Sequence, residues 1–154
     1  MNEKFLGPDH LDTGKIINGL GTLYFEQRNY SKAEPLYRRA LAIKEKSLGP
    51  NHPSVATTVN NLGQIFLLQH RYADAEPLFR RALDIREARL GKEHPDVATT
   101  LNDYASLLRS TNRKSEAKEM TARANRIVAK NHTTNRPNQT VDVKTLMDGS
   151  QKSN

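Results

Sequence analysis

The chain contains no cysteine and no tryptophan, and only 6% of its residues are aromatic. Without cysteine, disulfides, thiolate metal sites and cysteine nucleophiles are excluded. The first residues lack the apolar segment of a signal peptide, and no stretch approaches the roughly 18 apolar residues that span a bilayer. We therefore expect a soluble, cytoplasmic protein. A hydrophobic content of 36% is low for a single globular core but suits a stack of layers.

Positive charge exceeds negative charge, with 24 Lys and Arg against 17 Asp and Glu and a net charge of +7. Such an excess favours anionic partners, including nucleic acid, acidic peptides and membrane surfaces. The excess is spread along the chain without a block of like charge, whereas nucleic-acid-binding proteins usually cluster Lys and Arg on one face. The pattern favours a mixed-sign solvated surface, and an electrostatic binder of nucleic acid stays a secondary alternative.

The chain repeats itself every 42 residues. Without gaps, residues 8–49 and 50–91 share 19 identities in 42 positions, and residues 50–91 and 92–133 share 12. Self-similarity at such a period indicates stacked structural repeats. We divide the chain into the end of a preceding repeat helix (1–7), unit one (8–49), unit two (50–91), a degenerate capping unit three (92–133) and a polar tail (134–154) with a short capping helix expected at 138–148.

Each unit has the pattern of two antiparallel helices. In unit two they are expected at about 54–69 and 73–89, from apolar residues at i, i+3 and i+7. Small residues at one register position of the first helices, Gly21, Gly63 and Ala105, predict close helix approach.

Helix ends are also marked in the sequence. Gly49 and Gly91 have the position of C-terminal caps, and Ser31 with Glu34 has the spacing of a capping box. These features predict an all-α fold, an α-solenoid of stacked antiparallel helix hairpins.

The repeat resembles a known family through the spacing of Val59, Leu62, Gly63, Phe66, Ala75, Phe79 and Ala82, which is similar to the tetratricopeptide signature. Residues 48–58 and 72–83 look like the 42-residue variety found in kinesin light chains and in many other proteins, including bacterial ones. The resemblance covers roughly residues 6–130. It implies a tetratricopeptide superhelix whose first helices line a concave groove that binds a protein or peptide as an adaptor or scaffold, without catalysis or cofactors.

Carried over from that family, the groove positions lie on the first helix of each unit. They are Lys15, Asn18, Thr22, Phe25, Thr57, Asn60, Gln64, Leu67, Thr99, Asn102, Ser106 and Arg109. This set is polar, uncharged in the middle and basic at its two ends, Lys15 and Arg109. Similar grooves in kinesin light chains accept short peptides with acidic and aromatic residues, with which the basic ends are compatible.

Asn18, Asn60 and Asn102 recur at one register position and have two alternative roles. An amide side chain both donates and accepts hydrogen bonds, so the three could hold the backbone of an extended peptide. Alternatively, they bond neighbouring helices and keep the stack in register. The positions of a carboxylate clamp of the chaperone-adaptor type hold Thr22, Gln64 and Ser106, so such a clamp is not supported.

The remaining candidate residues have structural interpretations. Histidines at one register position lie at least one helix-packing distance apart, about 8–10 Å, too far for one zinc ion. We therefore expect His10, His52 and His94 to have a structural role in the loop before each first helix. The paired arginines 38–39 and 80–81 lie near glutamates and indicate a salt-bridged surface rather than a phosphate site. No metal, membrane or small-molecule substrate is expected.

Self-association is the first functional alternative. Leu6, Gly7 and Pro8 match Leu48, Gly49 and Pro50, so the chain opens at the tail of a preceding second helix. The face of unit one that would meet a missing helix pair is expected to be partly apolar, and this N-terminal end could form a homo-oligomer.

Overall fold

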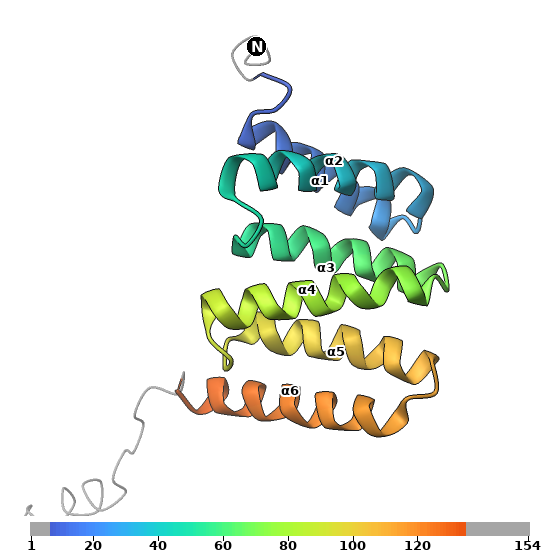
Figure 1. Cartoon of the computed structure of the whole chain (residues 1–154), viewed down its shortest axis with the longest axis vertical. Helices are drawn as coiled ribbons and strands as arrows, with labels where there is room; N and C mark the ends of the chain where they lie inside the picture. The colour runs from blue at the N-terminus through green and yellow to red at the C-terminus, as the bar shows by residue number, and fades with distance from the viewer. Residues whose placement is uncertain (1–6, 135–154) are drawn as a thin grey trace, which may run out of the picture.

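A computed structural model describes residues 7–134, which form six helices. They are α1 (Leu11–Glu26), α2 (Tyr30–Leu48), α3 (Pro53–Leu68), α4 (Tyr72–Leu90), α5 (Pro95–Ser110) and α6 (Lys114–Thr134). Consecutive helices pair as three hairpins, and α2 packs on α3 as α4 packs on α5 (Figure 1). This arrangement confirms the predicted fold class. The expected capping helix at 138–148 lies outside the described residues.

The first helix of each hairpin is capped by a histidine side chain. The imidazole Nδ1 atom accepts a hydrogen bond from the backbone N–H two residues later, at 3.0–3.1 Å, in His10, His52 and His94. Each ring thereby satisfies one of the backbone donors that a helix start leaves unpaired. The structural role predicted for the three histidines is confirmed.

The capping box predicted at the start of α2 is wrong. The helix begins at Tyr30, and its N-cap residue, Asn29, makes no side-chain cap bond. Glu34 instead accepts from Arg38 within α2, at 3.0 Å, and from Arg71 of the next hairpin, at 3.2 Å. Hydrogen bonds between charged groups are stronger than a bond to a neutral backbone N–H, so the contact between units displaces the local one.

The predicted close approaches within hairpins are confirmed. A Cβ atom at Gly21 would lie 3.0 Å from the Tyr37 ring, and one at Gly63 would lie 2.8 Å from the Phe79 ring. The glycines therefore let α1 and α3 pack directly on the aromatic rings of α2 and α4. At the other end of the second helices, Gly49 and Gly91 have φ of 88° and 90° and act as the predicted C-caps.

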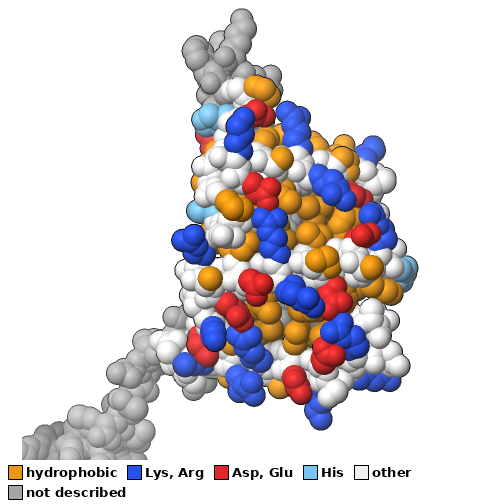
Figure 2. All heavy atoms as spheres, viewed as in Figure 1, with side chains coloured by type: hydrophobic (Ala, Val, Ile, Leu, Met, Phe, Trp, Pro, Cys, Tyr) orange, Lys and Arg blue, Asp and Glu red, His pale blue; other side chains and the backbone are white. Residues whose placement is uncertain are grey.

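No helix within residues 7–134 is both long enough and apolar enough to cross a membrane. Positively and negatively charged side chains intermingle on the face drawn in Figure 2, with apolar side chains between them. This view agrees with the mixed-sign surface expected from the sequence.

Candidate functional site

The predicted groove positions form a stripe along α1, α3 and α5, which we call the first-helix face. Because they recur at i, i+3, i+7 and i+10, they lie on one side of each helix. Five of the twelve side chains are exposed: Lys15, Thr57, Thr99, Asn102 and Arg109. Helices α3 and α5 also contact each other directly, so the stripe continues from unit two to unit three.

The other predicted positions are less accessible. Partial exposure is found for Asn18, Thr22, Phe25, Gln64, Leu67 and Ser106, whereas Asn60 is buried, with 3% of its surface exposed. Thr22 shares a hydrogen bond with the hydroxyl of Tyr37, at 2.9 Å, which ties the face to the interior of its own hairpin. The face therefore combines exposed polar side chains with others, such as Thr22, that are held by contacts to the interior.

Asn18 bonds the neighbouring unit. Its Oδ1 atom accepts from the Thr58 hydroxyl of α3, at 2.8 Å, and from the Lys44 ammonium of α2, at 3.4 Å. A side chain held by two donors of other helices fixes the register between units one and two.

Asn60 also bonds the next unit, but through its other side-chain atom and to a different register position. Its Nδ2 atom donates to the Asp103 carboxylate of α5 at 2.8 Å, and Gln64 Nε2 donates to the same oxygen at 2.9 Å. Asp103 is one of the residues that the sequence interpretation missed, and it places a carboxylate beside positions described as uncharged. The one available sequence signal was its place in the repeat, since Asp103 occupies the position that Gly19 has in unit one and Asn61 in unit two.

The three asparagines therefore lie in different surroundings. Asn18 and Asn60 are engaged by the next unit, whereas Asn102 is exposed. Within residues 7–134 no unit packs beyond α6, so Asn102 has no neighbouring hairpin to bond. Of the three amides, the one in unit three is the most accessible to a ligand.

A buried cation lies at each boundary between units. Lys44, 4% exposed, donates to the Thr58 hydroxyl at 2.8 Å and to the Ser54 carbonyl at 3.3 Å. Arg86, 6% exposed and in the same register, donates to the Thr100 hydroxyl at 2.6 Å and to the Asp96 carbonyl at 3.0 Å.

Burial is the main cause that lowers the pKa of both cations, because it penalises the charged form. The acceptors on the facing helix offset this cost only at one alignment of the two units. Each cation therefore fixes how one hairpin sits on the next, and the sequence interpretation did not identify either.

Glu76 connects the last two hairpins through a network of donors. It accepts from Arg113 at 2.7 Å and from the Tyr104 hydroxyl at 2.8 Å, and it pairs with Arg80 at 3.2 Å. The hydrogen bond from Arg113 is the largest cause that holds the pKa of the Glu76 carboxyl below its usual range. Together with the pair between Arg71 and Glu34, it joins successive second helices.

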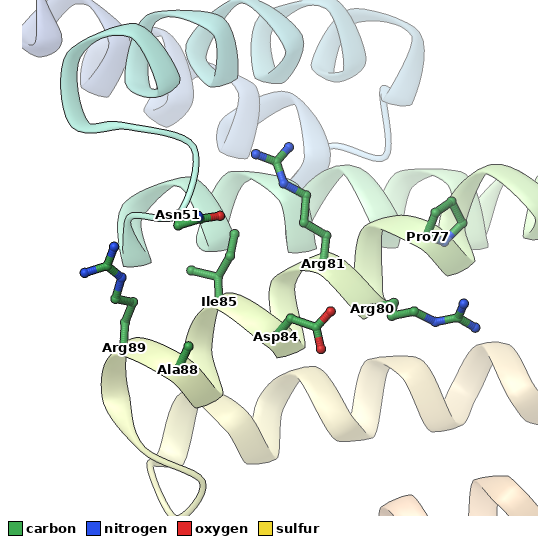
Figure 3. Close-up of a pocket in the computed structure, with 8 residues that line it drawn as sticks. All are labelled: Asn51, Pro77, Arg80, Arg81, Asp84, Ile85, Ala88 and Arg89. Atoms are coloured by element: carbon green, nitrogen blue, oxygen red, sulfur yellow. The ribbon is translucent and has the colours of Figure 1, made fainter.

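A hollow of about 590 Å³ lies on α4, away from the first-helix face, and Figure 3 shows its lining. Two of its three arginines are already paired: Arg80 with Glu76, and Arg81 with Glu45 and the Pro50 carbonyl. Arg80 points away from Arg81 and Arg89 in this view, so the guanidinium groups do not converge. The geometry agrees with the salt-bridged surface predicted for these arginines.

A second hollow, of about 520 Å³, lies at the basic end of the first-helix face. Arg109 of α5 and Lys114 and Lys118 of α6 line it. The Arg109 guanidinium is oriented by a hydrogen bond to the Thr121 hydroxyl at 2.7 Å. Within residues 7–134, no three His, Cys, Asp or Glu side chains are placed to hold a metal ion.

Models of the tetratricopeptide repeat match most of the chain, one at residues 13–54 and another at residues 41–88 and 54–128. A comparison with curated protein sequences returns no match.

Several solved structures have the same fold. BtubC (BKLC) from P. vanneervenii is 27% identical over 81% of this chain and 50% of its own, with a TM-score of 0.71. The nearly identical TPR-like repeats of a Podosopora anserina protein described as a putative kinesin light chain are 22% identical over 86% of this chain and 62% of theirs, with a TM-score of 0.70. The N-terminal domain of stress-induced protein-1 from C. elegans is 16% identical over 76% and 85%, with a TM-score of 0.60. The chain spans about half the length of the first and under two thirds of the second.

Proposed function

The chain belongs to the tetratricopeptide repeat family, and from this premise we propose that it binds an extended segment of a partner protein along the first-helix face. The repeats are of the kinesin light chain-like type, and tetratricopeptide repeats are in general non-catalytic modules of protein–protein interaction. The observation that carries the proposal is the row of exposed polar side chains over all three units, Lys15, Thr57, Thr99, Asn102 and Arg109.

Rigidity of the face supports this proposal. Lys44, Arg86 and the engaged amides of Asn18 and Asn60 hold the units at fixed spacing before any ligand arrives. A preorganised surface loses little conformational freedom on binding, so the ordering cost falls mainly on the partner segment. Asn18 and Asn60 would then support the face, and Asn102 would contact the ligand.

The partner segment is proposed to be acidic where it meets unit three. Arg109, Lys114 and Lys118 line one hollow, and carboxylates of a peptide would pair with these cations. The half-buried Phe25 and Leu67 offer apolar contact further along the face. This distribution favours a peptide with acidic residues at one end and an apolar residue toward the other.

A peptide-library pull-down followed by fluorescence anisotropy tests the proposal. Asn102→Ala and Arg109→Glu should each weaken binding of the enriched peptide at least tenfold while leaving the urea midpoint near that of the wild type. Arg39→Glu, an exposed charge reversal on α2, is the matched control and should bind as the wild type does. Equal affinity of all four proteins would refute binding on this face.

Asn60→Ala provides a second, different readout. This amide is buried against Asp103. Its loss should therefore lower the free energy of unfolding and speed up backbone hydrogen exchange at the boundary between units two and three. If Asn60→Ala abolishes binding but leaves stability unchanged, the amide contacts ligand directly, and the division of roles between Asn60 and Asn102 is wrong.

A further inference from the structure

Helix α1 carries three large apolar side chains that are exposed to solvent. Ile16 is 68% exposed, Leu20 42% and Leu23 49%, and their spacing places them on one side of the helix. We call this set the α1 stripe. No described residue covers it.

The same side of the other first helices is buried. One unit later the counterparts of the stripe are Thr58, Leu62 and Ile65, each at most 2% exposed. Two units later they are Thr100, Tyr104 and Leu107, each at most 4% exposed. Helix α2 covers this side of α3, and α4 covers it on α5. The α1 stripe therefore occupies the positions at which α3 and α5 pack against the preceding second helix, and residues 7–134 contain no helix that packs there.

The stripe lacks the polar contacts of the boundaries between units. Ile16 occupies the position of the threonines whose hydroxyls accept from Lys44 and Arg86. Gly19 occupies the position of Asn61 and of Asp103, which accepts from the preceding unit. A second helix with a buried cation would find no hydroxyl acceptor at the position of Ile16, so the stripe fits an apolar partner rather than another copy of the internal boundary.

The opposite end of the stack does not match the stripe. Where α4 places Tyr72, Glu76, Phe79 and Leu83, α6 has Lys114, Lys118, Thr121 and Asn125. Packing α6 of one copy on α1 of another would remove water from two ammonium groups over Leu20 and Leu23, which offer them no partner. Head-to-tail stacking of copies is therefore disfavoured.

We propose that the chain forms a twofold homodimer in which two α1 helices pack antiparallel through the α1 stripe. An apolar stripe is complementary to itself, which is the requirement of a twofold interface. With the axis at Leu20, Ile16 of one copy packs on the partner's Leu23, and Gly19 beside it lets the helices come close.

The charges that flank the stripe also pair in this arrangement. Lys15, which pairs with Asp12 of its own helix at 3.3 Å, lies opposite the partner's Glu26, since Leu20 is the midpoint of Lys15 and Glu26 to within one residue. The side chains of Lys15 and Glu26 are both exposed. Around a parallel pair of helices, each residue would instead meet its own copy and like charges would face each other.

Light scattering coupled to gel filtration tests the dimer. The wild-type chain should have about twice the monomer mass of 17.4 kDa, and Leu23→Glu should have the monomer mass with an unchanged helical spectrum. Leu68→Glu is the matched control, because Leu68 of α3 is 48% exposed, close to the 49% of Leu23, and lies off the stripe. It should remain a dimer.

Crosslinking tests the position of the axis. The chain has no cysteine, so Leu20→Cys introduces a single thiol, which should form a disulfide-linked dimer on mild oxidation because it meets its own copy at the axis. Leu68→Cys should stay uncrosslinked. Lys15→Glu should weaken the dimer at least fivefold, and Lys15→Glu with Glu26→Lys should restore it.

Three results would overturn the proposal. They are a wild-type mass of 17.4 kDa throughout a concentration series, a dimer that survives Leu23→Glu, and a dimer broken by Val128→Glu of α6 instead. The last would indicate contact through the opposite end of the stack. None of these outcomes bears on ligand binding at the first-helix face.

Discussion

The two boundaries between units solve one packing problem with different side chains. At each, a second helix inserts a cation under the next first helix, where a threonine hydroxyl and a backbone carbonyl accept from it. Lys44 at the first boundary also donates to Asn18, whereas Arg86 at the second reaches back to Thr57 at 3.4 Å. Both boundaries have the cation and the threonine, so this pair defines the register of one hairpin on the next. The third acceptor differs, because it is Asn18 for Lys44 and Thr57 for Arg86.

The surroundings of the two cations differ more. At the second boundary the Phe79 and Tyr104 rings stack with centroids 6.2 Å apart, and the Tyr104 hydroxyl bonds Glu76. At the first, the position of Tyr104 holds Leu62, and the guanidinium groups of Arg38 and Arg71 lie over the Phe66 ring, 5.4 and 4.2 Å from its centre. Both boundaries thus have a glutamate paired with an arginine of the next hairpin, and they differ at one register position, which holds Leu62 at the first and Tyr104 at the second.

Of the substitutions at the two boundaries, removal of the Phe79 ring should lower the free energy of unfolding the most. Phe79→Ala deletes the ring that stacks on Tyr104 and packs on Gly63, and it should lower the free energy of unfolding by about 3–5 kcal/mol. Urea unfolding measures the loss, and hydrogen exchange should place it at α3, α4 and α5. Tyr37→Phe, which keeps the ring at the first boundary, should cost about 1 kcal/mol. Similar losses of unfolding free energy in the two variants would contradict the view that packing of the ring contributes most of the stability at each boundary.

Removing the threonine acceptor should come next. Thr100→Val keeps the shape but leaves the Arg86 guanidinium without its side-chain acceptor, at a cost of about 2 kcal/mol, and Thr58→Val should cost about the same. Lys44→Met should cost less than either, because an apolar side chain of similar volume needs no acceptor. The adjacent exposed Thr99→Val is the control. If Thr100→Val and Thr58→Val both unfold at the wild-type urea midpoint, the cations do not set the register of the hairpins.

Acid should act on the second boundary through Glu76. Since the folded state holds its pKa below the usual value near 4.5, the carboxylate stabilises the fold above that pH, and this contribution disappears as the pH falls through the lower folded value. Glu76→Gln should lose about 1 kcal/mol at pH 7 and show a shallower fall of stability below pH 4.5. In an Arg113→Ala background the same substitution should cost less; equal costs in the two backgrounds would rule out the pair.

The smallest effect should come from the histidine caps, which are alike in all units. His52→Ala and His94→Ala should each cost about 0.5–1 kcal/mol, whereas His94→Asn should retain most of the stability, because an asparagine side chain also accepts from the helix start. Thermal melts of the three variants measure this. A loss from His52→Ala several times that from His94→Ala would show that the caps also serve the boundaries.

Features within a single hairpin were predictable from sequence. The helices, the glycines under Tyr37 and Phe79 and the histidines before each first helix follow from local spacing, and the 42-residue period fixed their register. Contacts between hairpins were less accessible to sequence reasoning. Lys44 and Arg86 have the composition of surface residues, and their burial depends on a hydroxyl 14 positions along the chain in another helix.

The candidate site divides in the same way. The resemblance located a stripe on the first helices, and most of its members keep some exposure, but the sequence could not show that Asn60 is buried while Asn102 is exposed. That difference arises because Asp103 packs over Asn60 from the next unit. The expected capping box was wrong for a related reason, because Glu34 is drawn to Arg71 of a neighbouring hairpin.

The matched cation and threonine also bear on how such a protein can grow. Unit two presents Thr58 to the hairpin before it and Arg86 to the hairpin after it, so a tandem duplication of residues 50–91 would place Arg86 of one copy over Thr58 of the next. Lys44 already occupies that position over Thr58, and Arg86 already occupies it over Thr100. A gene that gained one such segment in frame would therefore encode a longer stack whose new junction reuses the existing pair of cation and threonine.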